Sequence, residues 1–113
     1  MQPESMDRVF RALADPTRRR ILDLVKAKPG RNVNELAANF EMSRIGVLKH
    51  LKVLEDAELV LSERDGRNRR LYLNAVPIKM IHDRWTTEYS ALWAGRLTRL
   101  KYELEADDGD ESS

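Results

Sequence analysis

The chain has 113 residues, of which 42% are hydrophobic and 35% are charged, and it contains no cysteine. This length predicts one domain with a core sufficient for independent folding. The absence of cysteine excludes a disulfide framework and thiolate catalysis, and it agrees with a reducing compartment.

Charge is distributed unevenly along the chain. The net charge is +1, but residues 103–113 hold six acids and no base, which leaves +7 on residues 1–102. A basic body with an acidic extension is typical of a domain that binds a polyanion. The sequence shows neither a signal peptide nor an apolar run of membrane-spanning length, so we expect a cytoplasmic protein without a membrane partner.

The first third of the chain predicts three short helices. Residues 1–5 are expected to be flexible, and the apolar residues of segment 6–14 have helical spacing. Asp15-Pro16 predicts the start of a second helix, because Asp is a favoured N-cap and Pro suits the first helical position. Pro29-Gly30 ends that helix, and Asn34 is predicted to cap a third helix from Glu35 to about Asn39.

Three consecutive arginines, Arg18, Arg19 and Arg20, lie in the second predicted helix. Two interpretations stay open from the sequence: these side chains contact nucleic-acid phosphates, or they only solvate the surface. Phosphate contacts of this kind would position the protein without reading the base sequence.

Residues 43–58 predict a helix that is apolar on one side and basic on the other. Ser43 is a favourable N-cap, and Val47, Leu51 and Leu54 have the spacing of one buried stripe. Because this helix follows the short helix 35–39 after a tight turn, the pair forms a helix-turn-helix pattern, whose second helix enters the DNA major groove. The candidate DNA-binding residues on this helix are Ser43, Arg44, Ile45, Gly46, Lys49, His50, Lys52 and Val53. His50 lies toward the flank of the stripe, where it either donates to a phosphate or is a satisfied, half-buried histidine.

After Ala57 the spacing of apolar residues changes to that of β-strands. Two alternating segments, 59–61 and 71–73, flank Asp65-Gly66, a favoured tight-turn dipeptide, so we predict an antiparallel hairpin. Its arginine-rich tip suits the wing of a winged helix, since Arg can enter a narrow minor groove. The alternative is a soluble hairpin that uses Arg to discourage edge pairing. The candidate wing residues are Arg64, Arg67, Arg69 and Arg70.

Pro77 predicts the start of a long final helix with a slowly drifting apolar stripe. The two Trp and one Tyr on this stripe exceed what a small domain covers with its own core, so we expect a self-association surface. The candidate interface residues are Ile78, Ile81, Trp85, Tyr89, Leu92 and Trp93. The same aromatic surface is alternatively the wall of a pocket for an unknown small hydrophobic effector. Residues 106–113 are acidic and are expected to be disordered.

The segments 10–22, 35–37 and 42–60 together resemble the ArsR/SmtB-type winged helix-turn-helix repressors. The most specific part is Lys49-His50-Leu51-Lys52-Val53-Leu54 followed by Leu59-Val60. The resemblance covers residues 6–105 and implies a mainly α fold of about five helices with a two-stranded antiparallel wing. It also implies a homodimer, paired through its first and last helices with Phe10 in the interface, which binds a palindromic operator and represses transcription.

The stretch Pro77–Trp85 resembles a subgroup of this family that lacks metal sites. Metal-sensing members carry a Cys-x-Cys pair where this chain has Glu35-Leu36-Ala37-Ala38, and others bind zinc through histidines on the last helix, where this chain has only His82. Zinc requires about four ligands, so we predict no metal site and no cofactor. Leu48 stands where many members have Ser, and it either packs against a thymine methyl or fills the edge of the core.

Two other classes of function are weighed against DNA binding. An enzyme is not supported, because the sequence has no Cys nucleophile, glycine-rich phosphate loop or metal cluster. The remaining alternative is a winged-helix module that binds proteins without specific DNA binding. Such a module would need no basic recognition face.

Overall fold

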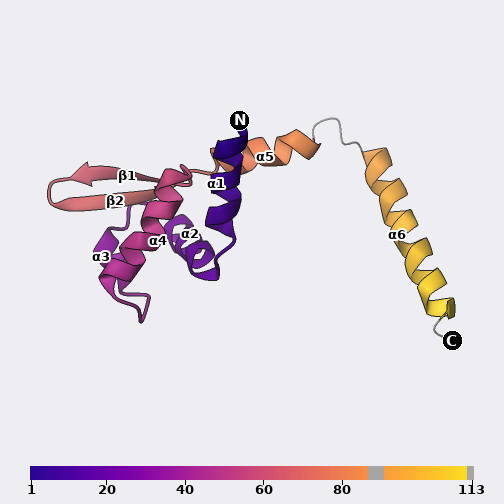
Figure 1. Ribbon diagram of the computed structural model, residues 1–113, viewed down its shortest axis with the longest axis horizontal. Coiled ribbons are helices and arrows are strands. Elements are labelled where there is room, and N and C mark those ends of the chain that lie inside the picture. The colour runs from indigo at the N-terminus through magenta and orange to yellow at the C-terminus, as the bar shows by residue number, and fades with distance from the viewer. Residues whose placement is uncertain (87–90, 112–113) are drawn as a thin grey trace. The chain divides into compact units, whose positions relative to one another are not determined.

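The structure is a computed structural model that describes residues 1–86 and 91–111, without the side chains of residues 91, 92 and 107–111. Six helices and one two-stranded antiparallel sheet are formed by the described residues (Figure 1). The chain divides into two compact units, Met1–Ile81 and His82–Ser113.

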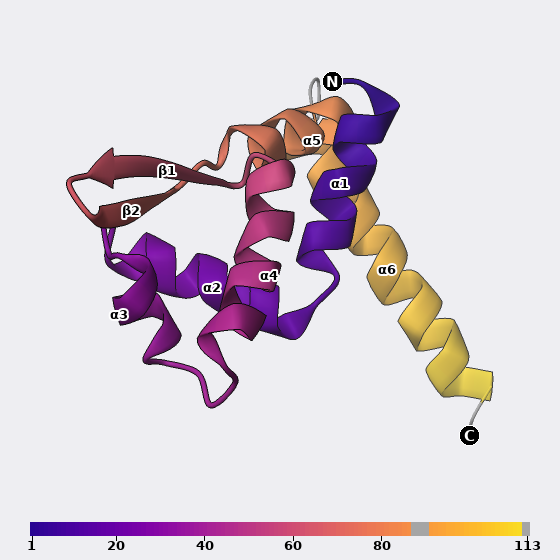
Figure 2. The same cartoon turned by 60° about the vertical axis from the view of Figure 1, so that its left-hand side comes forward.

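The first unit is a winged helix-turn-helix, which confirms the predicted fold class. Its elements in chain order are α1 (Pro3–Leu13), α2 (Pro16–Ala27), α3 (Val33–Ala37), α4 (Arg44–Asp56), β1 (Val60–Asp65) and β2 (Asn68–Leu73). Helices α1 and α2 both pack against α4, and α3 lies against α4 and β2, as Figure 1 and Figure 2 show. The long final helix predicted from the sequence is described as α5 (Val76–Thr86) and α6 (Ala91–Glu111), and residues 87–90 lie outside the described residues.

The core of the first unit forms where the apolar stripes of its helices meet the hairpin. Val47, Leu51 and Leu54 of α4 are fully buried, which confirms the predicted stripe. They cluster with Val9, Ala12, Ile21, Leu22, Val25, Val33, Leu36, Ala57, Leu59, Val60 and Leu71. Among the described residues no polar or charged residue is fully buried, so each basic or acidic residue keeps some contact with solvent.

Two of the three predicted N-caps are observed. The Asp15 side chain accepts a hydrogen bond from the Arg18 backbone N–H at 3.1 Å, and Ser43 Oγ accepts one from the Gly46 N–H at 3.1 Å. These bonds satisfy backbone donors that the first turn of a helix leaves free. The starts of α2 and α4 are therefore determined by residues next to them in the sequence.

Helix α3 starts two residues earlier than predicted, so the prediction of Asn34 as its N-cap was wrong. The cap is Asn32, whose side chain accepts from the Glu35 N–H at 2.8 Å. The preceding segment is bonded to the hairpin: the Gly30 N–H donates to the Leu71 carbonyl at 2.8 Å, and Asn32 forms a bridge with β2. A long-range contact thus decides where this helix begins.

The ends of the chain also differ from the predicted helix bounds. Helix α1 begins at Pro3, because Pro suits the first turn and Glu4 interacts favourably with the helix dipole there. Helix α6 continues to Glu111 and therefore includes most of the segment that the sequence predicted to be disordered. The bounds 6–105 for the domain itself stay a prediction.

Candidate nucleic-acid interface

Helix α4 presents basic and apolar side chains to solvent on the side opposite its buried stripe. Ile45 is 67% exposed, and Lys49 and Lys52 are exposed as predicted. Lys52 Nζ lies 3.2 Å from Asp56 Oδ1 in an exposed ion pair. Lys49 has no ion pair with any described residue, so its charge can be neutralised by a ligand.

Val53 does not share this outward side, contrary to the sequence prediction. It is half-buried against the core, and with Arg8, Arg11 and Asp56 it lines a hollow of about 390 Å³ beside α1. Val53 is half-buried because it lies on the flank of α4 that α1 covers. Gly46 lies on the same flank and is half-buried.

Leu48 lies on the opposite flank of α4 and packs against the core, as one of the two predictions for this residue stated. It also lines a small hollow of about 100 Å³ together with Arg44, Arg67 and Arg69 and with asparagines of α3 and the hairpin. Arg44 is oriented there because its Nε donates to Asn34 Oδ1 at 3.0 Å. Sequence reasoning missed Asn34 in this role, since the contact joins side chains of two different helices.

The hairpin carries two of its arginines outward. Strand pairing ends with Asp65 opposite Asn68, so the central turn residues are Gly66 and Arg67, one position later than the predicted dipeptide. Gly66 has φ +61°, which a two-residue turn with Gly at its first central position requires. Arg64 and Arg67 are exposed at this tip, where they can reach a groove or a phosphate.

The other two wing arginines hold the hairpin in place. Arg69 forms an ion pair with Glu55 of α4. Arg70 donates to Asp65 Oδ2 at 2.9 Å and to the Gly30 carbonyl at 3.0 Å, and its hydrogen bond to Asp65 raises the pKa of Arg70 above its ordinary value. The Arg69–Glu55 pair ties the wing to α4, and the Arg70 contacts tie the two strands to each other and to the segment before α3.

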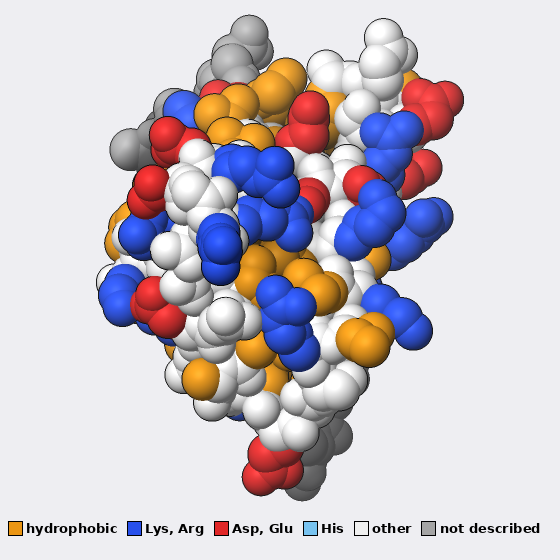
Figure 3. All heavy atoms as spheres, turned by 90° about the vertical axis from the view of Figure 1, so that its left-hand side faces the viewer, with side chains coloured by type: hydrophobic (Ala, Val, Ile, Leu, Met, Phe, Trp, Pro, Cys, Tyr) orange, Lys and Arg blue, Asp and Glu red, His pale blue; other side chains and the backbone are white. Residues whose placement is uncertain are grey.

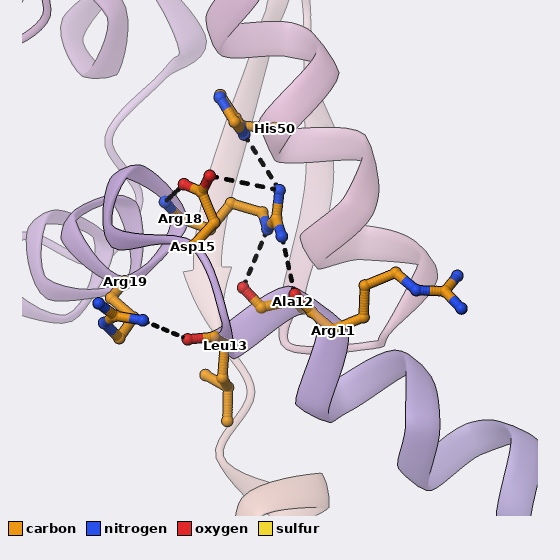
Figure 4. Close-up of polar contacts among 7 residues, drawn as sticks. All are labelled: Arg11, Ala12, Leu13, Asp15, Arg18, Arg19 and His50. Carbon is orange, nitrogen blue, oxygen red and sulfur yellow. Dashed lines mark hydrogen bonds and ion pairs between the residues drawn. The ribbon is translucent and has the colours of Figure 1, made fainter.

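Arg18 is directed into the protein, as Figure 4 shows. Its side chain is 15% exposed, because its Nε donates to the Ala12 carbonyl at 2.9 Å and its Nη2 to the Arg11 carbonyl at 2.7 Å. These two acceptors belong to the last turn of α1. The hydrogen bond from the Arg18 backbone and, to a smaller extent, the nearby guanidinium lower the pKa of Asp15 from its ordinary value. Arg18 therefore joins the start of α2 to the end of α1, and its Nη1 reaches His50 of α4 at 3.4 Å.

Arg19 and Arg20 remain at the surface. Arg19 donates to the Leu13 carbonyl at 2.7 Å, and the guanidinium of Arg20 lies 5.0 Å from the centroid of the Phe40 ring. Both contacts orient the side chains and leave them accessible. The phosphate contacts suggested for these two arginines stay predictions.

The face that contains the hairpin tip is predominantly basic. In Figure 3 a band of Lys and Arg side chains crosses the middle of this face, interspersed with hydrophobic side chains, and the acids lie mostly toward its rim. This distribution matches the net charge that residues 1–102 carry. A surface of this kind attracts a polyanion over a distance and then offers apolar contacts at close range.

The predicted dimer-interface residues are largely exposed in the single chain. Within the first unit, Phe10 and Ile78 are exposed and Ile81 is half-buried against the core. Within the second unit, Trp85 and Trp93 are exposed. Tyr89 and the side chain of Leu92 lie outside the described residues. Further exposed apolar residues on α6 are Leu97, Leu100, Tyr102 and Leu104.

Neither a metal cluster nor a membrane span is found in the described part of the chain. No three His, Cys, Asp or Glu side chains gather there as a metal site would require. His82 instead lies 3.2 Å from Asp83 and 3.0 Å from Thr86 through Nδ1. None of the described helices combines the length and the apolar character needed to cross a bilayer.

Comparisons with known proteins agree with this geometry. Residues 13–63, which run from the end of α1 into β1, match a family model described as a helix-turn-helix domain. The HTH-type transcriptional regulator YuzN of Bacillus subtilis is 39% identical over 85 residues, covering 70% of this chain and 92% of that protein. The chain belongs to the HTH-type transcriptional regulators. Its solved relatives include an ArsR family transcriptional regulator, whose crystal structure has a TM-score of 0.68 and 34% identity, over 83% of this chain and 95% of that one.

Membership in the ArsR family fixes the general activity. Members are DNA-binding transcriptional regulators and not enzymes, and the resemblance read from the sequence is confirmed. Transcriptional repressor SdpR of Bacillus subtilis is also similar, with 39% identity over 62 residues, 55% of this chain and 68% of that protein.

Proposed function

We propose that this ArsR-type regulator acts as a homodimer that binds a palindromic operator and represses transcription. In the proposal, Ile45 and Lys49 of α4 face the major groove, while Arg64 and Arg67 of the wing reach the adjacent minor groove or its phosphates. Ser43, Arg44, Gly46 and Lys52 border the same surface. Arg69 and Arg70 support the wing, and Arg19 and Arg20 contact the phosphate backbone.

One observation carries the proposal: the unpaired charge of Lys49 and the outward wing arginines lie on elements that are tied together by the Arg69–Glu55 ion pair. A recognition helix and wing held in this way can contact neighbouring grooves at once. The similarity to SdpR, which is named a transcriptional repressor, supports repression and not activation of transcription.

The dimer is supported by the apolar side chains that the single chain leaves exposed. Phe10 is 45% and Trp93 53% exposed, which is unfavourable unless another surface covers them. A dimer would also supply two recognition helices about one turn of B-DNA, roughly 34 Å, apart. Sedimentation analysis of the full chain should give a dimer, and Phe10→Glu should shift it toward monomer with a matching loss of operator affinity.

The decisive experiment for DNA binding is genome-wide mapping of the bound DNA, followed by titration of the recovered sites with purified protein. An inverted-repeat site whose affinity falls steeply with salt supports the proposal. The rival function, a winged-helix module that binds proteins, predicts weak binding without sequence preference. Finding no enriched sites and no difference between recovered and scrambled DNA would favour that rival.

We also propose that DNA binding does not depend on a metal ion. The chain has no cysteine, and His82 already uses Nδ1 within its own helix. Control by a small hydrophobic effector is compatible with the exposed Trp85 and Trp93, because an interface pocket would place a ligand beside them. Their fluorescence would report such a ligand during a metabolite screen, and unchanged emission with unchanged DNA affinity would favour control by protein abundance alone.

A further inference from the structure

The flank of α4 that faces α2 contains one side-chain contact that the proposed function does not yet use. Arg18 Nη1 and His50 Nδ1 lie 3.4 Å apart and form a hydrogen bond between residues 32 positions apart in the chain. Arg18 is held for this contact by the carbonyls of Arg11 and Ala12 and by Asp15 Oδ2 at 3.9 Å. The guanidinium is therefore fixed before any ligand binds.

This contact determines where the imidazole carries its proton. Arginine has N–H donors and no acceptor, so Nδ1 of His50 must offer its lone pair. In the neutral ring the proton then resides on Nε2. Figure 4 shows this second ring nitrogen on the side of the imidazole that points away from Arg18.

The Nε2 atom is accessible and unused. It has no hydrogen-bond partner among the described residues. It is also absent from the side-chain atoms of those residues that are both buried and without a partner, so it is open to solvent. His50 stands directly after Lys49, the outward cation of α4. An N–H donor on the flank of this helix is suited to a phosphate oxygen, which only accepts hydrogen bonds.

We propose that Arg18 is a positioning residue for DNA binding, which holds His50 as the Nε2–H tautomer so that Nε2 donates to a phosphate oxygen of the bound DNA. The opposite tautomer would place two donors against each other at Arg18. It would also turn a lone pair toward the phosphate. The inference rests on the proposed DNA-binding function, and it assigns His50 to the backbone and not to the bases.

The tautomer is tested first, in the free full-length protein. Long-range ¹H–¹⁵N correlation spectra of the ¹⁵N-labelled chain at pH 8 should show His50 with a protonated Nε2 and an unprotonated Nδ1, with His82 as a second histidine in the same spectrum. Arg18→Met should give a mixture of tautomers. Arg19→Met is the matched control, because the Arg19 guanidinium bonds to Leu13 and does not reach His50.

The DNA contact is tested second, with two variants of His50. Each variant places an amide group near one of the two ring nitrogens. Gln at position 50 can place its amide donor near Nε2, whereas Asn places its amide near Nδ1. We expect His50→Gln to retain affinity within about threefold and His50→Asn to lose about tenfold, the size of one hydrogen bond. Because the donor is neutral, the salt dependence of binding should be unchanged in His50→Asn, unlike the loss of a cation.

The outcomes separate this inference from the proposed function. A His50 ring protonated on Nδ1, or an Arg18→Met spectrum identical to wild type, overturns the role of Arg18 whatever the DNA results. Equal affinities for His50→Gln and His50→Asn in folded proteins overturn the phosphate contact. Wild-type protein that binds no DNA sinks the proposed function, while the tautomer measurement still stands. If Arg18→Met does not fold, Arg18→Leu, which also removes every donor facing Nδ1, replaces it in the same spectrum.

Discussion

Asn74 holds the backbone of Glu58 in place: its Nδ2 donates to the Glu58 carbonyl at 2.8 Å, just beyond the end of α4. Glu58 has φ +61°, the only positive φ of a non-glycine residue among the described residues. The Asn74 N–H also donates to the Leu59 carbonyl at 2.9 Å. The end of the recognition helix and the end of the wing are thus joined at one strained residue.

Replacing Glu58 with glycine should therefore stabilise the protein. A left-handed backbone costs an L-residue about 1–2 kcal/mol, and glycine avoids this cost while losing some chain entropy. We expect Glu58→Gly to raise the free energy of unfolding by about 0.5–1 kcal/mol in urea titrations. Glu58→Ala is the control, since it removes the exposed side chain but keeps the strain, and an equal gain from it would argue against strain.

The Ser43 hydroxyl should contribute to the stability of α4. Ser43→Ala removes the acceptor for the Gly46 N–H, and loss of an N-cap costs about 1 kcal/mol. Chemical denaturation measures this change without reference to DNA. Ser43→Asp provides an acceptor and a favourable charge at the helix start, so it should be as stable as wild type; a large loss there would point to another role for the hydroxyl.

Lys49 should contribute directly to operator affinity. Lys49→Ala is expected to weaken binding by about 1–3 kcal/mol in fluorescence anisotropy at fixed salt, and to reduce the salt slope by about one if the ammonium contacts a phosphate. Lys26→Ala removes the same charge from an exposed position of α2 and should have a much smaller effect. Similar losses in the two variants would mean that only net charge matters.

Arg67 should contribute to operator affinity through its position at the wing tip as well as through its charge. Arg67→Ala is expected to weaken operator binding by about 1–3 kcal/mol, with the larger loss on sites whose flanks are A·T-rich and narrow in the minor groove. Binding to operators with A·T-rich and G·C-rich flanks measures the difference. An unchanged titration midpoint on both would remove Arg67 from the interface.

Acid should destabilise the protein partly through Asp15. Its folded-state pKa is lowered from 3.8 by the Arg18 N–H and the Arg18 guanidinium, so the stability it contributes is present above pH 3.8 and is lost as pH falls through the folded pKa. Asp15→Asn keeps a capping oxygen but cannot titrate. Denaturation midpoints between pH 6 and pH 2 should fall less steeply in this variant; parallel curves would assign the acid sensitivity to other carboxylates, among them Glu35, whose pKa the Lys28 contact also lowers.

The sequence by itself determined the elements whose cause is local. Asp15-Pro16 and Ser43 start α2 and α4, Gly66 permits the hairpin turn, and the periodic spacing of apolar residues separates helix from strand. These features depend on hydrogen bonds and side-chain positions within about four residues, so neighbouring residues suffice to predict them.

The tertiary structure decided which partner each long or flanking side chain takes. Arg69 pairs with Glu55, Arg18 reaches His50, and Val53 turns toward α1, although the sequence allowed all three to face outward. Likewise α3 begins at Val33 because the segment before it is bonded to β2. A guanidinium on a flexible stem can reach many acceptors, and only the packing of distant elements selects among them.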